Sequence, residues 1–189
     1  GEYRDISYSR YYEEIRCLGE ALLCRGFSNT RIVIIGKNSY NWYLANMATL
    51  LTGNITVPLD KELKYDEFES SLIRSEAEVI FYDEKESESV AKAISSGKTR
   101  IKAAFPLFKV SDKTDIYDLT VEGRELVDGG SRKYDDVVIN PDAMSFMIFT
   151  SGTTSQSKIV MLSQRNVASN VVNTIASEQI YDTDVNISL

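Results

Sequence analysis

Hydrophobic residues in the first part of the chain alternate between a helical and an extended pattern. Ser7 is a good N-cap for a helix that is expected to run to about Gly26 and to pack on a sheet. Its apolar positions recur at helical spacing at Tyr8, Tyr11, Tyr12, Ile15, Leu18 and Leu22. The β-branched run over 31–36 then predicts a strand buried on both faces, and Asn38 or Ser39 is expected to cap the next helix.

The same alternation continues to residue 130. Further strands are expected over 55–59, 78–82 and 103–108. Pro58 marks the end or the edge of the first of these, because proline cannot donate a ladder hydrogen bond. Amphipathic helices are expected between and after them, burying Phe68, Leu72, Ile73, Val90, Ala91, Ile94, Ile116, Leu119, Leu126 and Val127. Strands that alternate with helices predict an α/β fold with a mostly parallel sheet flanked by helices.

Composition and charge exclude several classes of protein. The 189 residues suit one domain, and a hydrophobic content of 43% is ordinary for a globular chain. A net charge of -7 without a basic stripe argues against nucleic-acid binding, and no apolar run approaches the roughly 20 residues that span a bilayer. The first residues do not form a signal peptide, and we interpret Cys17 and Cys24 as reduced thiols of a cytoplasmic protein.

The chain contains no histidine, which removes the usual general base, the Ser-His and Cys-His nucleophile pairs and histidine metal sites. Any catalysis must therefore come from electrostatics and positioning, or from residues outside this chain. The carboxylates Glu84, Glu86 and Glu88 alternate around an expected surface helix, which favours a solvated face over a metal or acid–base site. The turn 36–38 (Gly-Lys-Asn) could contact a phosphate, although a plain tight turn is the favoured interpretation.

A hydroxyl-rich segment from Thr150 to Lys158 is the strongest candidate for chemistry. It contains six hydroxyl side chains, one glycine and the lysine, and it lies between the apolar runs 144–149 and 159–162. Hydroxyls and free backbone N–H groups bind phosphate oxygens, and a lysine adds a compact positive charge. Ser163 is expected to cap the closing helix, which would bury Val167, Val171 and Ile175.

Two alternatives compete with a phosphate-binding role for this segment. A Walker A loop shares the spacing of Gly152 and Lys158, but Ser157 stands in place of its second glycine. In addition, Ile159 replaces the magnesium-binding hydroxyl, and a strand rather than a helix is expected to follow. The Walker interpretation therefore fails. On composition alone, a simple hairpin connection would be favoured.

The order of residues in the segment resembles the phosphate-binding signature of adenylate-forming enzymes, the acyl-CoA synthetases and their relatives. That order is Thr150-Ser151-Gly152-Thr153-Thr154, then Lys158, then Val160-Met161-Leu162-Ser163 and Asn166. Upstream segments are similar to the N-terminal part of bacterial long-chain fatty-acid–CoA ligases. These segments are Ile32 to Gly36, Asn38, Trp42, Val57 to Leu63, Arg74 to Ala77, Glu122-Gly123-Arg124 and Asn140-Pro141-Asp142.

Four positions depart from the common pattern of that family. Ser155 stands where the family usually has glycine, and Ser157 where it has proline. Ile159 stands where glycine or alanine is frequent, and Gln164 where histidine is frequent. Serine at the first two positions keeps the loop small and polar, whereas glutamine at 164 removes a possible charge.

The resemblance implies an ATP-dependent acid–thiol ligase. Such an enzyme forms an acyl-adenylate and pyrophosphate from a long-chain fatty acid and ATP, and then transfers the acyl group to coenzyme A. ATP, Mg²⁺ and coenzyme A would serve the whole enzyme, and peripheral membrane association would be compatible with it. In this chain the residues expected to bind the β- and γ-phosphates are Thr150, Ser151, Gly152, Thr153, Thr154, Ser155 and Lys158.

Residues 1–189 would then be the N-terminal part of the large AMP-binding domain. The magnesium, coenzyme A and acyl sites and the small mobile domain would lie beyond Leu189, so we expect this segment to be inactive alone and its loop to be mobile from Ser151 to Ser157. A luciferase-like, aryl-activating or amino-acid-activating relative would share the same loop. The alternative of a different class is a non-catalytic α/β module that binds a partner or an anionic metabolite, which a stop codon after Leu189 would favour.

Overall fold

The computed structural model of the chain describes residues 5–110, 112–150, 157–181 and 183–185. In chain order the elements up to the fourth strand are α1 (Tyr8–Cys24), β1 (Arg31–Ile35), α2 (Tyr40–Leu51), β2 (Ile55–Leu59), α3 (Tyr65–Ser75), β3 (Val79–Tyr82), the 3₁₀ turn η1 (Glu84–Glu86), α4 (Ser87–Ser95) and β4 (Ala103–Pro106). They are followed by α5 (Ile116–Asp128), β5 (Met144–Thr150), β6 (Lys158–Ser163) and α6 (Gln164–Ser177).

The strands form one mixed sheet in the order β4-β3-β1-β2-β5-β6. β1 lies near the centre, with Val33 opposite Val57 of β2 on one side and opposite Ile80 of β3 on the other. All neighbours are parallel except β5 and β6, which are antiparallel. The expected α/β fold with a mostly parallel sheet is therefore confirmed, and Pro58 lies one residue before the end of an interior strand.

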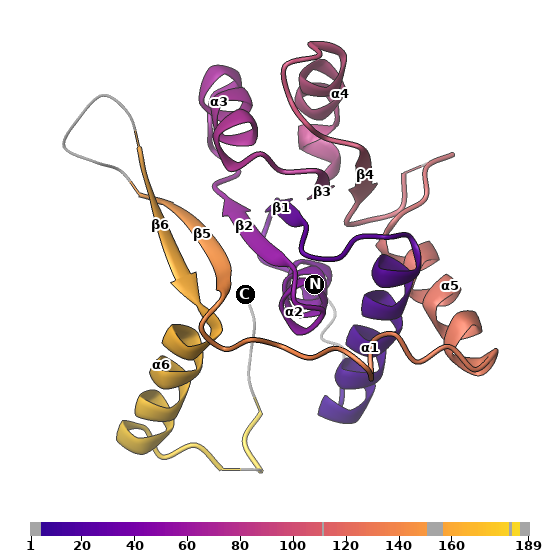
Figure 1. Ribbon diagram of the computed structural model, residues 1–189, viewed down its shortest axis with the longest axis vertical. Helices are drawn as coiled ribbons and strands as arrows, with labels where there is room; N and C mark the ends of the chain where they lie inside the picture. Colours follow the sequence, from indigo (N-terminus) through magenta and orange to yellow (C-terminus); the bar gives the residue numbers. More distant parts are fainter. Residues whose placement is uncertain (1–4, 111, 151–156, 182, 186–189) are drawn as a thin grey trace.

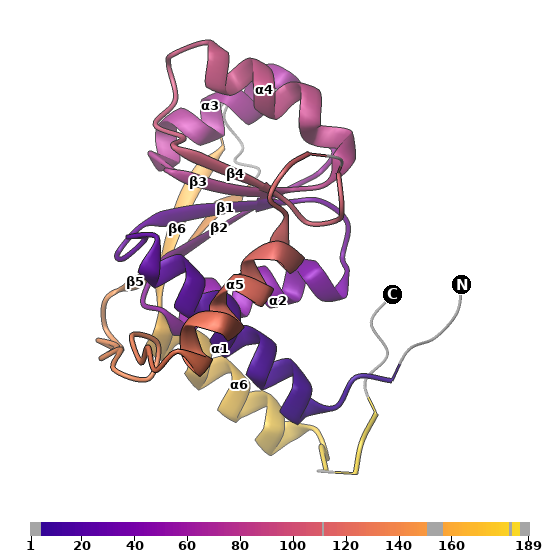
Figure 2. The ribbon, with the colours of Figure 1, turned by 90° about the vertical axis from the view of Figure 1, so that its right-hand side faces the viewer.

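The two faces of the sheet are covered by different helices (Figures 1 and 2). On one face Ile32 and Ile34 are fully buried in a cluster with residues of α1, α2 and α5. On the other face Val33 and Ile35 are buried against α3 and α4. Successive residues of a strand point to opposite faces, so a continuous apolar run is what a strand covered on both sides requires.

Local capping signals place the helix starts where the sequence predicts them. The Ser7 hydroxyl accepts the backbone N–H of Arg10, and the Ser39 hydroxyl accepts that of Trp42. At α6 the Ser163 hydroxyl accepts the backbone N–H of Asn166. Each bond satisfies one of the N–H groups that a helix start leaves without an intrahelical partner.

The first helix packs on the sheet as expected, through Ile15, Leu18 and Leu22, but the expected burial is wrong at its start and on the last helix. On α1, Tyr8 and Tyr12 are 65% and 58% exposed, and burial begins only at Ile15. On α6, Val171 and Ile175 are about half exposed and Val167 is half-buried, so the described residues cover that face only in part. Helical spacing identifies an apolar face, but burial depends on what packs against it. For the same reason three further positions expected inside, Ile73, Ala91 and Ile94, are exposed.

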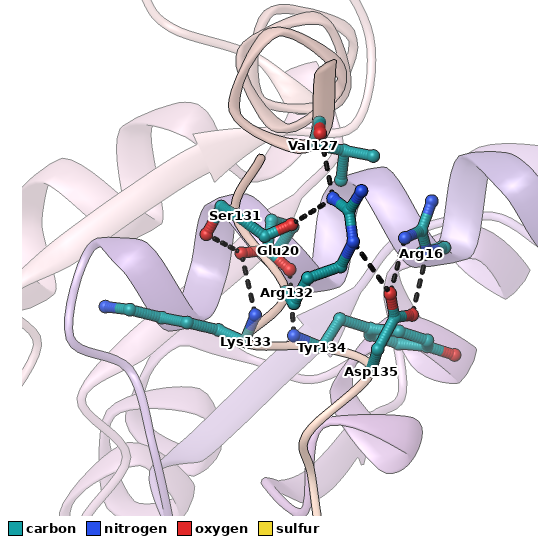
Figure 3. A network of polar contacts seen from close by, with 8 residues as sticks. All are labelled: Arg16, Glu20, Val127, Ser131, Arg132, Lys133, Tyr134 and Asp135. Atoms are coloured by element: carbon teal, nitrogen blue, oxygen red, sulfur yellow. Dashed lines mark hydrogen bonds and ion pairs between the residues drawn. The ribbon is translucent and has the colours of Figure 1, made fainter. Parts of the chain in front are cut away.

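The segment between α5 and β5 is fastened to α1 by a buried carboxylate and a neighbouring ion pair (Figure 3). Glu20 is 1% exposed and accepts hydrogen bonds from the Ser131 hydroxyl and from the backbone N–H groups of Lys133 and Tyr134, the latter two at 3.1 and 2.8 Å. Next to it, Arg16 pairs with Asp135 through two nitrogens. A polar connector without regular structure is thereby held against the helical layer.

Candidate functional site

The two ends of the hydroxyl-rich loop meet at the tip of the β5–β6 hairpin. Thr150 and Lys158 form the outermost pair of the hairpin, next to the pair of Phe149 and Ile159. Both are exposed, and within the described part of the chain Lys158 has no carboxylate partner. The other expected phosphate ligands, Ser151, Gly152, Thr153, Thr154 and Ser155, lie outside the described residues, as does most of the segment expected to be mobile.

The hairpin tip lies at the edge of the sheet where an α/β fold binds ligands. Because β5 runs parallel to β2, the carboxyl end of β5 lies at the same edge as those of β1, β2 and β3. The connection after β1 leads to α2 on one face of the sheet, and the connection after β2 leads to α3 on the other. Ligands of open α/β sheets bind outside the carboxyl ends of strands at such a divergence.

A pocket of about 380 Å³ opens at this divergence. It is lined by the turn after β1, by the end of β2 and by one side chain of α2, namely Gly36, Lys37, Asn38, Leu59, Asp60, Lys61 and Trp42. Two lysines and one carboxylate give its rim a mixed charge with a positive excess. The turn 36–38, which the sequence indicated weakly as a phosphate contact, therefore lines this pocket.

Gly36, the glycine of that turn, is required because another side chain approaches it closely. A Cβ atom on Gly36 would lie 2.7 Å from Cγ of Asp83, and its φ of +154° is one that side chains rarely permit. The carboxylate of Asp83 accepts the backbone N–H of Lys37 at 2.7 Å. This N–H group is therefore committed inside the protein, in agreement with the favoured interpretation of a tight turn.

Arg74, in the last turn of α3, connects this helix to the hairpin tip. Its Nη1 donates to the hydroxyl of Ser157 at 3.0 Å, and its Nη2 donates to the backbone carbonyl of the same residue at 2.7 Å. Its guanidinium carbon lies 5.3 Å from the centre of the Phe149 ring. The sequence showed Arg74 only as part of an upstream similarity, and no local pattern links it to a residue so far along the chain.

Three of the four positions that depart from the family pattern are described, and each has a structural contact. Ser157 is held by Arg74. Ile159 is half-buried against the apolar cluster under α3 and α4. The side-chain amide of Gln164 donates to the backbone carbonyl of Leu50 at 2.7 Å, which ties the start of α6 to the end of α2.

The upstream similarity at 122–124 is explained by helix packing. A Cβ atom on Gly123 would lie 1.7 Å from the carbonyl oxygen of Cys17, so α5 and α1 can approach this closely only with glycine. On either side, Glu122 pairs with Arg25 of the loop after α1, and Arg124 pairs with Glu13 of α1.

The similarity at 140–142 also has a structural role. The carbonyl of Pro141 accepts the backbone N–H of Arg165, and the carboxylate of Asp142 pairs with the Arg165 guanidinium at 2.6 and 2.9 Å. These contacts fasten the turn before β5 to the first turn of α6.

Carboxylates of the described residues do not assemble into a metal site. No group of three or more acidic, cysteine or histidine side chains that could hold an ion is found among the described residues. Of the three glutamates near α4, Glu84 and Glu88 are exposed, as expected for a solvated face, but Glu86 is half-buried. Burial, and then the charge of Asp83, raise the pKa of Glu86. The expectation of a uniformly solvated face is therefore wrong at this one residue.

The two cysteines are free thiols, Cys17 buried and Cys24 partly buried. None of the helices in the described ranges combines the length and the apolar character that crossing a membrane would require.

Comparison with known proteins identifies the family. The family described as AMP-binding enzyme matches residues 1–188. Long-chain-fatty-acid–CoA ligase 5 of Mus musculus is 26% identical over 181 residues, which cover 89% of this chain and 26% of that protein. Long chain acyl-CoA synthetase 4 of Arabidopsis thaliana is 25% identical over 200 aligned positions, covering 100% of this chain and 30% of that protein. Similarity to long-chain ligases is thus not restricted to bacterial proteins.

Solved structures show the same fold. A long-chain-fatty-acid-CoA ligase from Archaeoglobus fulgidus superposes with a TM-score of 0.79 at 21% identity, over 97% of this chain and 35% of that one. A putative long-chain-fatty-acid CoA ligase from Rhodopseudomonas palustris superposes with a TM-score of 0.78 at 19% identity, over 96% of this chain and 44% of that one.

The chain thus spans about a quarter to a third of the length of the curated relatives named above. The match of the family to nearly every residue, together with the shared fold, shows that the chain belongs to the AMP-binding enzymes, the adenylate-forming family.

Proposed function

We propose that the protein containing this chain is an ATP-dependent acid–thiol ligase. It joins a long-chain fatty acid to AMP with release of pyrophosphate, and then transfers the acyl group to coenzyme A. The observation that carries the proposal is the placement of Thr150 and Lys158 opposite each other at the carboxyl edge of the sheet, in a chain of the AMP-binding family.

The loop from Thr150 to Lys158 binds the β- and γ-phosphates of ATP. Its hydroxyls and backbone N–H groups, from Thr150, Ser151, Gly152, Thr153, Thr154 and Ser155, supply hydrogen bonds to phosphate oxygens. The ammonium group of Lys158 offsets the charge that develops on the departing pyrophosphate. The role is electrostatic and positional, which suits a chain without histidine.

Residues 1–189 form the N-terminal part of the large AMP-binding domain under this proposal. The share of the relatives' length that the chain spans supports this division. Mg²⁺ and coenzyme A would serve the whole enzyme, and their sites are proposed to lie in other parts of the polypeptide. The segment alone is then inactive. We propose a cytoplasmic location for the whole enzyme, which is compatible with peripheral association with a membrane.

The long-chain fatty acid is proposed because the mouse and plant relatives carry names of that activity. The test is acid-dependent exchange of radiolabelled pyrophosphate into ATP by the full-length protein, with a panel of fatty acids of increasing length, an aryl acid and amino acids. Exchange that is strongest with long-chain fatty acids is expected. Exchange with an aryl acid or an amino acid only would replace the substrate, and ATP binding without exchange for any acid would contradict the proposed reaction.

A further inference from the structure

Arg74 contacts a residue on each side of the hairpin tip, where the phosphate-binding loop begins and ends. Just before β6, its two terminal nitrogens donate to the hydroxyl and the carbonyl of Ser157, which directly precedes Lys158. On β5 its guanidinium packs over the ring of Phe149, one residue before Thr150. One side chain from α3 therefore contacts a neighbour of each end residue of the loop.

Arginine has the chemistry that this position uses. Its planar guanidinium presents donors in a fixed fork and can lie on an aromatic face at the same time, which the single ammonium group of lysine cannot do. The side chain is half-buried, and within the described ranges no carboxylate forms an ion pair with it. Its hydrogen bonds are thus directed at the hairpin rather than divided with an acidic partner.

The hydrogen-bonded ladder between the hairpin and the rest of the sheet is short, although β5 lies alongside β2. β5 pairs with β2 only at Thr56 and Phe146, whereas β1 pairs with β2 at every residue. At the far end of the hairpin, Gln164 fastens the start of α6 to Leu50. At the loop end, Phe149 and Ile159 pack on the apolar cluster, and the polar contacts to the helical layer among the described residues are those of Arg74.

We propose that Arg74 is a positioning residue of the phosphate-binding site. It fixes the separation and twist of the two hairpin ends that carry Thr150 and Lys158, and so sets where these two residues face a phosphate group. The inference rests on the proposed function for its catalytic consequence, but the anchoring of the hairpin is independent of that function.

The first measurement tests the anchoring without any ligand. Hydrogen–deuterium exchange is compared in the full-length protein for wild type, Arg74→Ala, Arg74→Lys and the control Arg100→Ala, whose guanidinium is mostly exposed and pairs with Glu76 instead. Exchange of peptides covering 144–163 is expected to rise about tenfold in Arg74→Ala, the low end for one lost bond from a charged donor because the side chain is only half-buried, and to stay unchanged in the control. Unchanged exchange in Arg74→Ala would overturn the proposal.

The second measurement tests the positioning of phosphate ligands by steady-state pyrophosphate exchange. The KM for ATP is expected to rise about tenfold in Arg74→Ala, with the KM for the acid unchanged, because the mutation displaces phosphate ligands only. In Arg74→Lys the KM for ATP is expected to lie closer to that of Arg74→Ala than to that of the wild type on a logarithmic scale. Lysine keeps the positive charge but lacks the forked donors of arginine. Full restoration by lysine, or a parallel rise of both KM values, would overturn the positioning role.

Two further variants keep the outcomes separable. If Arg74→Ala fails to fold, Phe149→Leu and Ser157→Ala remove one contact each and are expected to give smaller shifts in the same direction. If the wild type shows no pyrophosphate exchange with any acid, the proposed function fails, while the hydrogen-exchange arm still decides whether Arg74 holds the hairpin.

Discussion

The carboxylate of Glu20 accepts the backbone N–H of Tyr134 at 2.8 Å, across 114 residues of sequence (Figure 3). Replacing Glu20 by alanine leaves the N–H groups of Lys133 and Tyr134 and the Ser131 hydroxyl without their acceptor inside the protein. We expect Glu20→Ala to lower the free energy of unfolding by roughly 3 kcal/mol, because unpaired buried donors retain their desolvation cost. Chemical denaturation measures the change. Glu125→Ala, on the exposed side of α5, is the control. A similar loss of unfolding free energy in both variants would contradict this account.

The same carboxylate makes stability depend on pH. Burial raises the pKa of Glu20, but the hydrogen bonds from Ser131, Tyr134, Lys133 and Cys24 outweigh burial, and the net pKa is lowered. A group whose pKa is lowered by folding stabilises the protein above its unfolded pKa, about 4.3 for glutamate, and this contribution is lost as pH falls through the folded value.

We therefore expect the unfolding free energy of the wild type to decline below about pH 4.3 more steeply than that of Glu20→Gln. Several exposed carboxylates that form ion pairs contribute to the decline in both proteins, so the difference between the two curves isolates Glu20. Parallel curves between neutral pH and about pH 3 would show that this carboxylate is not coupled to folding.

Gly123 is predicted to be intolerant of any side chain. Gly123→Ala would place a methyl group 1.7 Å from the backbone carbonyl oxygen of Cys17, and the helices α1 and α5 would have to separate. Overpacking against backbone costs more than against a flexible side chain, so we expect a loss of about 3 kcal/mol or more. The control is Gly129→Ala, where the nearest atom would be 3.2 Å away and the expected loss is less than about 1 kcal/mol. Thermal denaturation of both variants provides the comparison.

Lys158→Ala is predicted to impair the first half-reaction of the full-length enzyme. Removing a charge that acts on developing pyrophosphate should lower kcat/KM for pyrophosphate exchange about a hundredfold, with little change in stability because Lys158 is exposed. Lys158→Arg is expected to recover part of the activity. The control is Lys102→Ala, which replaces an exposed lysine directly before β4 and is expected to leave pyrophosphate exchange unchanged. Undiminished exchange in Lys158→Ala would remove this residue from the proposed site.

Much of the fold was accessible from the sequence because the signals are local. The run 31–36 shows by its β-branched residues that a strand is covered on both faces, and Ser7, Ser39 and Ser163 mark helix starts through bonds that span three residues. The order of residues around Thr150 and Lys158 likewise indicated the family, and the apolar runs on either side indicated the two strands that flank the loop.

Burial and long-range contacts were decided only by the tertiary structure. Tyr12 and Ile175 have the spacing of buried positions but are exposed, because spacing does not reveal whether another element covers a face. Arg74 and Ser157 are separated by 83 residues, and no periodicity links them until α3 and the hairpin are packed side by side. Sequence fixes which conformations each segment prefers locally, whereas the contacts that position the phosphate-binding loop exist only after distant segments have come together.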